Sequence, residues 1–324
     1  MLRNRSALNA YLMVLMFAGC SAAYAQATYP SKPVRIVTSA AGGGSDFSAR
    51  IVAQGLTSSF GQQVIIENRG GGNGVISAQT VAKSSADGYT LALLASQLWL
   101  LPFLLDSVPY DPEKDFMPIS VIDISPNVLV VHPSLPVNSV RELISLAKAR
   151  PGELNYSRPS AGSPTHLSAE LFKTMAGVNI VSVAYKGGGP AVIAIVAGEV
   201  ELGFVSLAAG VSSIRAKRLR VLAVSTAEPW PLFPDLPTVA ASGLPGFESV
   251  LVNGMFAPTG TPTSLIQRMN QEVVQVLRRP EIKERFINSG AEPVGSSPEE
   301  LRSFVKSEMA KWGKLIKAAN IRGE

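Results

Sequence analysis

The sequence is poor in the residues that build metal sites and disulfide frameworks. Its 324 residues contain one cysteine and two histidines. A structural zinc site normally takes four Cys or His ligands, and a disulfide needs two cysteines. We therefore predict no metal, no cofactor and no disulfide, and a fold that depends on its hydrophobic core. With 46% apolar residues, the chain lies well above disordered proteins and has enough material for that core.

A large excess of charge is also missing, since the chain has 29 basic and 24 acidic residues and a formal net charge of +5. No basic run is long enough to follow a phosphate backbone, so we expect no nucleic-acid partner. The densest basic groups have helical spacing, and we interpret them as solvent-facing helix surfaces: Arg215, Lys217, Arg218 and Arg220, and Lys311, Lys314 and Lys317.

Beyond residue 25, the chain has no apolar run of the roughly 20 residues that a membrane-spanning helix requires. Residues 1–25 are instead typical of a signal peptide. Arg3 and Arg5 precede an apolar stretch over residues 8–18, and Ala23-Tyr24-Ala25 is a small-residue cleavage site. The stretch Phe17-Ala18-Gly19-Cys20 resembles a lipoprotein box, so a lipid anchor on Cys20 stays open as the alternative. Both interpretations predict an exported protein.

From residue 33 onward, short β-branched runs alternate with stretches of helical periodicity. The first set has strands at 34–38, 64–67 and 89–94, separated by helices over 46–59 and 75–83. This order predicts a parallel sheet with helices on both faces. A second set begins with a strand at 127–132 and a helix whose start carries the capping pair Ser139 and Glu142. Its further elements are strands at 154–156, 180–183, 200–204 and 220–224, and helices from about 165, 190 and 208.

A proline-rich stretch after Thr226 suits a crossing segment better than a sheet interior. The tail that follows offers a strand near 250–256 and helices over 263–277, from 281, and over 298–318. Because the tail lacks enough strands for its own domain, we expect it to complete the first one. The prediction is two α/β lobes, residues 26–126 plus 239–324 and residues 127–238, joined by a two-segment hinge.

The candidate ligand site consists of two turns of small residues, 38–46 and 157–165, each between a strand and a helix. Small residues let backbone N–H groups converge at the positive end of the following helix, which suits a carboxylate. In an open α/β sheet both turns lie at the carboxyl ends of strands. The arrangement therefore predicts a dianion that is held from both sides.

Simpler roles compete for the polar residues of these turns. Asp46 either contacts the ligand or caps its own helix. His166 lies close to Ser163, but no G-x-S-x-G motif surrounds that serine and no carboxylates occupy matching positions of the two turns. We therefore predict no enzyme, with a hydrolase using Ser163 and His166 as a minor alternative. Residues 69–74 lack the last glycine of a dinucleotide-binding loop.

Motifs along the chain resemble the extracytoplasmic receptors of the tripartite tricarboxylate transporter family, the Bug proteins. Two of the matching stretches are Gly42-Gly43-Gly44-Ser45-Asp46 and Tyr185-Lys186-Gly187-Gly188-Gly189. The matching segments run in the same order as in the family from residue 29 toward the C-terminus: 29–37, 42–46, 64–69, 87–91, 109–112, 166–170, 185–191, 236–239 and 256–262.

The resemblance implies a periplasmic-binding-protein fold of the two-lobed, type II-like kind that closes on a small carboxylate without catalysis. It implies a periplasmic protein, expected to be a monomer, that delivers its ligand to membrane transporter subunits. A periplasmic adaptor for a membrane sensor kinase is the alternative. Carried over by position, the ligand-binding residues are Ala40, Ala41, Gly42, Gly43, Ser45, Asp46, Ser96, Ser160, Gly162, Ser163, Thr165, Tyr185, Val205 and Ser206.

Two departures from the family pattern bear on the ligand. Val205 stands where the family frequently has an aspartate, which removes a partner for the amino group of aspartate or glutamate. The apolar run Leu98-Trp99-Leu100-Leu101 replaces a more polar segment. Our hypothesis is therefore a mono- or dicarboxylate with an apolar or aromatic portion.

Overall fold

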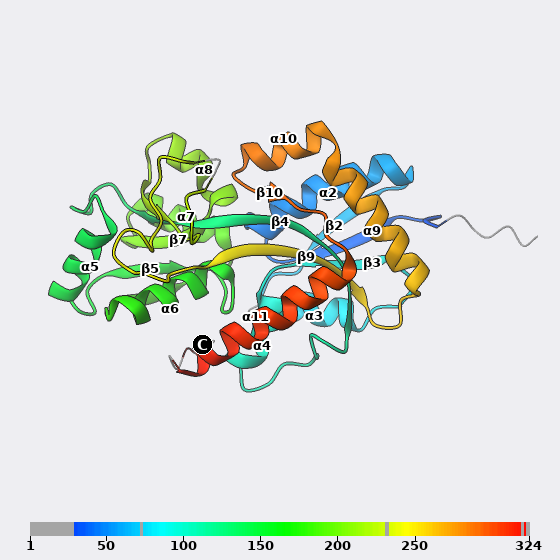
Figure 1. The fold of residues 1–324 in the computed structure, drawn as a ribbon, viewed down its shortest axis with the longest axis horizontal. Coiled ribbons are helices and arrows are strands. Elements are labelled where there is room, and N and C mark those ends of the chain that lie inside the picture. Colours follow the sequence, from blue (N-terminus) through cyan, green and yellow to red (C-terminus); the bar gives the residue numbers. More distant parts are fainter. Residues whose placement is uncertain (1–28, 72–73, 231–232, 319–320, 322–324) are drawn as a thin grey trace, which may run out of the picture.

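The computed structural model describes residues 29–71, 74–230, 233–318 and 321. The signal peptide predicted over residues 1–25 and the lipid anchor on Cys20 lie outside these residues. Two α/β halves lie side by side and share one sheet, with strands in the order β2-β1-β3-β9-β4-β7-β5-β6 (Figure 1). The strands β8 and β10 also pair with β4.

The first half begins as the sequence predicts, with β1 (Val34–Thr38), β2 (Val64–Asn68) and β3 (Thr90–Leu94) paired in parallel. Their connections are α2 (Gly44–Phe60) and α3 (Val75–Ala82). All side chains of β3 are buried, as expected for a strand covered on both faces. Helix α4 (Gln97–Leu104) was not predicted, because its almost wholly apolar sequence has no helical periodicity to detect.

Strand β4 (Phe116–Val131) runs through both halves and is much longer than the predicted strand at 127–132. Residues 116–126 pair with β9 (Val250–Pro258), and residues 127–131 pair with β7 and β8, in every case antiparallel. Register shifts near Pro118 and Asp123 accommodate residues that disfavour a strand. The sheet is therefore mixed rather than parallel, since β9 also pairs antiparallel with β3.

The second half follows the prediction closely. Its strands are β5 (Asn155–Arg158), β6 (Val181–Ala184), β7 (Leu202–Ser206) and β8 (Arg220–Val224), and β5 pairs in parallel with β6 and β7. Its helices are α5 (Val140–Ala149), α6 (Pro164–Ala176), α7 (Gly188–Ala197) and α8 (Leu207–Arg215). Ser139 caps α5 as predicted, because its Oγ accepts the backbone N–H of Glu142 at 3.2 Å.

The remaining elements return to the first half: α9 (Thr263–Arg278), α10 (Pro280–Asn288), β10 (Glu292–Pro293) and α11 (Pro298–Ala318). Helix α9 packs on α2 and β4, and α11 packs on β4 and α4. The tail thus adds its helices to the first half. The exact lobe boundaries at 126/127 and 238/239 stay a prediction. None of the helices in the described part of the chain is long and apolar enough to cross a bilayer.

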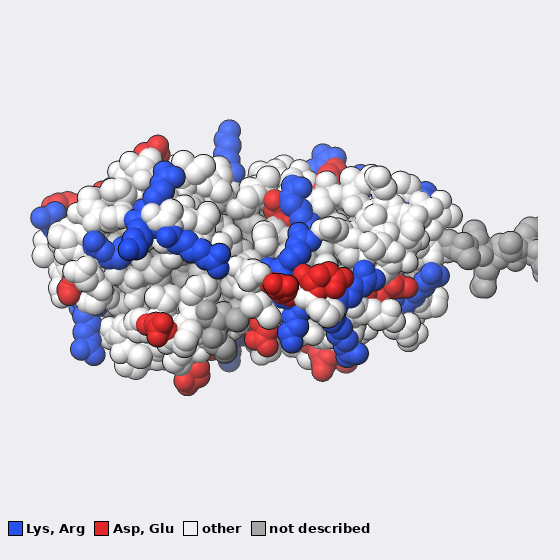
Figure 2. All heavy atoms as spheres, turned by 90° about the horizontal axis from the view of Figure 1, so that it is seen from above, with Lys and Arg blue, Asp and Glu red and all other residues white. Residues whose placement is uncertain are grey.

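Charged side chains are scattered over the face that Figure 2 shows, with Lys and Arg on both halves and acidic residues among them. The predicted solvent-facing surface at the end of α8 holds for Arg215, Lys217 and Arg218, which are exposed. It does not hold for Arg220, whose guanidinium donates to the carbonyls of residues 133, 135 and 137. That arginine therefore anchors the loop that leads into α5.

A candidate ligand-binding cleft

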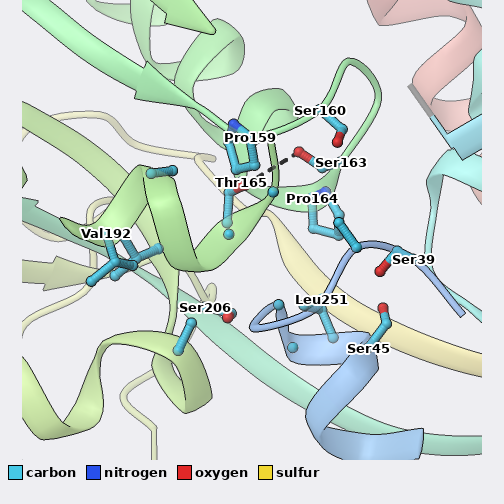
Figure 3. A pocket seen from close by; sticks show the side chains of 18 of the residues that line it. Ser39, Ser45, Pro159, Ser160, Ser163, Pro164, Thr165, Val192, Ser206 and Leu251 are labelled. Atoms are coloured by element: carbon cyan, nitrogen blue, oxygen red, sulfur yellow. Dashed lines mark hydrogen bonds between the residues drawn. The ribbon is translucent and has the colours of Figure 1, made fainter. Parts of the chain in front are cut away.

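A cleft of about 600 Å³, which includes space open to solvent, lies where the two halves meet. Figure 3 shows Ser39 and Ser45 on one side of it, and Ser160, Ser163 and Pro164 on the other. The residues of the sequence-based site that line the cleft are Ala40, Gly43, Ser45, Ser160, Ser163, Thr165, Val205 and Ser206. The structure thus brings the two predicted turns together across one cavity.

Several helices begin at this cleft. Gly43, Ser163, Gly187 and Ser206 are the N-cap residues of α2, α6, α7 and α8, and all of them line it. No side chain caps α2, α7 or α8. Helix N-termini carry partial positive charge and present backbone N–H groups, so their convergence creates a positive potential inside the cleft.

That positive potential comes without cationic side chains. Among the described residues that line the cleft, none is Lys, Arg, His, Asp or Glu. The polar lining consists of serine and threonine hydroxyls and the Gln97 amide, while Val192, Phe204 and Leu251 supply apolar surface. Such a lining can hydrogen-bond an anionic group and cover a hydrocarbon segment, but it offers no counter-ion for a ligand amine.

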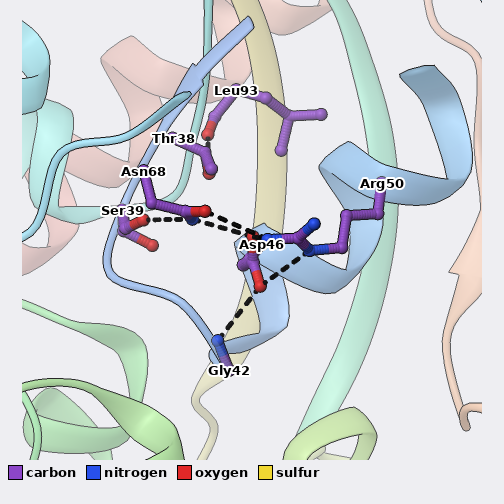
Figure 4. Close-up of polar contacts among 7 residues, drawn as sticks. All are labelled: Thr38, Ser39, Gly42, Asp46, Arg50, Asn68 and Leu93. Carbon is purple, nitrogen blue, oxygen red and sulfur yellow. Dashed lines mark hydrogen bonds and ion pairs between the residues drawn. The ribbon is translucent and has the colours of Figure 1, made fainter. Parts of the chain in front are cut away.

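Asp46 does not line the cleft, because its carboxylate is fully engaged beside the first turn (Figure 4). Oδ2 accepts the backbone N–H of Gly42 at 3.0 Å and Arg50 Nε at 3.1 Å. Oδ1 accepts Asn68 Nδ2 at 2.8 Å. Of the two roles considered for Asp46, the structure favours the one that fixes the start of its own helix.

The second turn is stabilised by His166, which is 3% exposed. His166 Nδ1 accepts the Gly162 N–H at 3.1 Å, and the His166 N–H donates to Ser163 Oγ at 3.3 Å. Burial lowers the pKa of His166 to about 4, so the ring is neutral near pH 7. Because its Nδ1 binds the backbone rather than the Ser163 hydroxyl, the pair lacks the arrangement of a nucleophile and its base.

Other predicted site residues lie outside the cleft lining. Ser96 Oγ donates to the Gly162 carbonyl at 3.2 Å and so connects the two halves. Ala41 and Gly42 belong to the outer part of the first turn, where Gly42 lies against Gly189. Tyr185, also predicted as a ligand-binding residue, is half-buried; its ring packs against a hydrophobic cluster and its hydroxyl lies 3.4 Å from Glu199 Oε2.

A third turn, after β6, completes the cleft, and of this turn only Tyr185 was predicted as a site residue, not the lining residues Gly187 and Gly188. A Cβ atom on Gly188 would lie 3.2 Å from Gly43 Cα, and one on Gly187 would lie 2.9 Å from Ala40 Cβ. The backbones of the first and third turns are therefore in contact. The same strand, glycine and helix pattern that marked the first turn is present at 184–190 and could have revealed it. Further lining residues absent from the predicted set are Ser39, Gly44, Gln97, Pro159, Pro164, Ala191, Val192, Phe204, Ala209 and Leu251.

Comparison with known protein families gives a match over residues 48–321 to the tripartite tricarboxylate transporter family receptor. The protein BugT of Bordetella pertussis is 37% identical over 303 residues, which cover 93% of this chain and 93% of BugT.

Within the described part of the chain, no group of three His, Cys, Asp or Glu residues is placed to hold a metal ion.

Solved structures agree with the sequence comparison. An R. palustris protein solved with adipate is 40% identical, with a TM-score of 0.88 and coverage of 91% of this chain and 99% of that one. MatC from Rhodopseudomonas palustris, solved with bound malate, is 28% identical, with a TM-score of 0.85 and coverage of 89% and 100%. These neighbours share the complete two-lobed α/β arrangement.

Proposed function

We propose that this chain, which belongs to the receptor family of the tripartite tricarboxylate transporters, captures an organic dicarboxylate in its cleft. It then delivers this ligand to membrane transporter subunits. The receptors of this family are periplasmic binding proteins and not enzymes. The observation that carries the proposal is the convergence of the α2, α6, α7 and α8 N-termini on a cleft whose described lining holds no charged residue.

The distribution of these N-termini supports two carboxylate positions. A Cβ atom on Gly44 would lie 3.3 Å from Ser206, and one on Gly188 would lie 3.2 Å from Gly43, so the starts of α2, α7 and α8 are close together. The start of α6, with Ser163 and Thr165, forms the other position. Val192 and Leu251 add apolar surface to the same cleft, which favours a hydrocarbon linker. The ligands named for the two solved relatives, adipate and malate, are both dicarboxylates.

Charge-assisted hydrogen bonds from backbone N–H groups and hydroxyls would offset the desolvation of each carboxylate. Because Val205 leaves the cleft without an acidic residue in its described lining, a zwitterionic amino acid would bury its ammonium group unpaired. The proposed ligand class is therefore a dicarboxylate without an amino group. Export through residues 1–25 would place the receptor in the periplasm, where we expect it to be a monomer.

A thermal-shift panel tests the proposal. The purified protein is heated with adipate, malate, citrate, glutamate, a monocarboxylate and an aromatic acid, after mass spectrometry of denatured protein has shown that no ligand copurifies. A ligand at 100 times its Kd should stabilise the protein by about 2.7 kcal/mol. We expect the largest shift with a linear dicarboxylate. A clear shift with glutamate alone, or none with any acid, would contradict the proposal.

The transporter partner needs a separate experiment. Photo-crosslinking of the ligand-loaded protein in its native cells, followed by mass spectrometry, should recover transporter membrane subunits. Recovery of a sensor kinase instead would replace delivery by the adaptor role while leaving ligand capture intact.

A further inference from the structure

A chain of buried polar side chains connects the cleft to Asp123 on β4. Ser45 lines the cleft, and its Oγ donates to Asn253 Oδ1 on β9 at 2.6 Å. Asn253 Nδ2 in turn donates to both carboxyl oxygens of Asp123, each at 3.1 Å. The exposed fractions of Ser45, Asn253 and Asp123 are 5%, 0% and 1%. Water therefore cannot substitute freely for any of these contacts.

The charged form of Asp123 fixes the direction of every hydrogen bond in this chain. A carboxylate only accepts, so it takes the N–H group of the Asn253 amide. The amide oxygen then faces Ser45, and because that oxygen also only accepts, Ser45 must donate its single hydroxyl hydrogen to it. Ser45 thus presents lone pairs to the cleft and cannot donate to a carboxylate there.

The neutral form permits the opposite direction. A protonated Asp123 can donate its O–H to the Asn253 oxygen once that amide turns over. Asn253 Nδ2 then donates to Ser45 Oγ, whose hydrogen becomes free to point into the cleft. Ser48, whose Oγ lies 3.2 Å from Asn253 Nδ2, can donate or accept and so serves either arrangement.

We propose that Asp123 is a positioning residue that acts through Asn253 to set whether Ser45 donates to a bound carboxylate, so that charging Asp123 weakens carboxylate binding. This inference rests on the proposed function, because it requires a carboxylate next to Ser45. The negative charge of ionised Asp123 also weakens carboxylate binding directly, because it offsets the partial positive charge at the start of α2.

The surroundings of Asp123 allow this change near neutral pH. Burial raises the pKa of Asp123 to about 7, against the effect of hydrogen bonds from Ser48 and Asn253. Among the described residues, no charged side chain contributes to the shift. Pro293 of β10 pairs with Asp123 in register and does not titrate.

Charged groups on the neighbouring elements have other surroundings. On α2, Asp46 and Arg50 pair with each other at 3.0 Å. On β10, Glu292 is exposed. Helix α9 also packs on β4, where its Asn270 donates to the Ile119 carbonyl. The protonation of Asp123 is therefore governed mainly by its own burial.

Calorimetric titration with adipate across about pH 6 to 8.5 tests the inference. We expect the wild-type Kd to rise about fivefold with pH, the value of one hydrogen bond. Asp123→Asn should bind adipate as tightly as the wild type does at the lowest pH. Its Kd should not change with pH, apart from the effect of the titration of adipate itself. Glu292→Gln, which removes an exposed carboxyl on the neighbouring strand, should keep the wild-type profile.

Titration of Ser45→Ala and NMR of the Asn253 side-chain amide test the two other links of this chain. Ser45→Ala removes the hydroxyl through which Asp123 is inferred to act, so it should bind adipate more weakly at low pH and lose the part of the pH dependence that this hydroxyl carries. In the ligand-free protein, the side-chain amide NMR signals of Asn253 should move with pH in the wild type. Equal pH profiles in wild type and Asp123→Asn, or Asn253 signals that do not move, would overturn the inference. If none of the acids in the thermal-shift panel binds, the proposed function fails, and the pH response of the Asn253 signals alone tests whether Asp123 controls the direction of the hydrogen bonds.

Discussion

The turns before α2 and α6 have the same design in the sequence, yet they satisfy their backbone groups differently. At α6, the Ser163 hydroxyl accepts the His166 N–H, and His166 Nδ1 accepts the Gly162 N–H. At α2, the N-cap Gly43 has no side-chain cap, and of the backbone N–H groups in this turn Asp46 accepts that of Gly42. A turn that satisfies its own groups is rigid without ligand, whereas the α2 turn keeps donors for an anion. Two turns of similar sequence, both proposed to bind a carboxylate, therefore differ in how many of their backbone donors stay available to the ligand.

Lowering the pH should destabilise the α6 turn, because that turn depends on a neutral His166. The pKa of His166 is about 4 in the folded protein and about 6.5 in the unfolded chain. The unfolded state therefore binds a proton first, and stability that is present above pH 6.5 is lost as the pH falls toward 4. The loss should reach on the order of 3 kcal/mol. Urea unfolding of wild type and His166→Gln measures it; equal pH slopes in the two proteins would refute the assignment.

Gly188→Val should break the contact between the first and third turns. A side chain here would meet the Gly43 backbone, with Cα at 3.2 Å from the added Cβ, and would hold the halves apart. We expect dicarboxylate affinity to fall about 100-fold, since donors on both sides could no longer reach one ligand. Calorimetry checks this. Ala197→Val, at the exposed end of the same helix, is the matched control and should bind normally.

Asp46→Asn should weaken the first turn alone. The amide cannot accept from Gly42, Arg50 and Asn68 together, so we expect a loss of about 2 kcal/mol in unfolding free energy and a lower ligand affinity. Amide hydrogen exchange should accelerate at residues 40–46 and stay unchanged at 160–166. Faster exchange in both turns would show that they are not independent.

Ser163→Ala should change stability and ligand affinity less than the other variants, and it tests the α6 turn. It removes the cap of α6, which should cost about 1 kcal/mol of stability. Because that hydroxyl is already engaged with the backbone, ligand affinity should fall less than in Asp46→Asn. Ser139→Ala, which removes the cap of α5, should cost similar stability with no change in affinity. A larger affinity loss in Ser163→Ala than in Asp46→Asn would reverse the roles of the two turns.

Local patterns were enough to predict most elements, and the exceptions have physical causes. Strands β1 and β3 and the capped helix α5 carry their signal within a few residues. The first part of β4 was missed because Pro118, Asp123 and Pro126 argue against a strand, and only bulges and the pairing with β9 accommodate them. Helix α4 was missed because it is buried on nearly every side.

Local sequence patterns also predicted only part of the ligand site. The first two turns could be predicted because glycine and serine follow a strand and precede a helix. The contact of Gly188 with Gly43 depends on how the halves approach each other, which no local pattern reports. The pairing of Asp123 with Asn253 joins residues 130 positions apart and became visible only with the register of β4 and β9.

The absence of charged side chains from the described cleft lining also bears on the environment in which such a receptor would work. Screening by dissolved salt weakens attraction between exposed charges, but it has less effect on short contacts between backbone dipoles and a ligand that the cleft covers. Ligand affinity should therefore change less than about twofold between dilute and concentrated sodium chloride. A receptor of this construction would keep a constant sensitivity to its ligand while the osmotic conditions outside the cell vary.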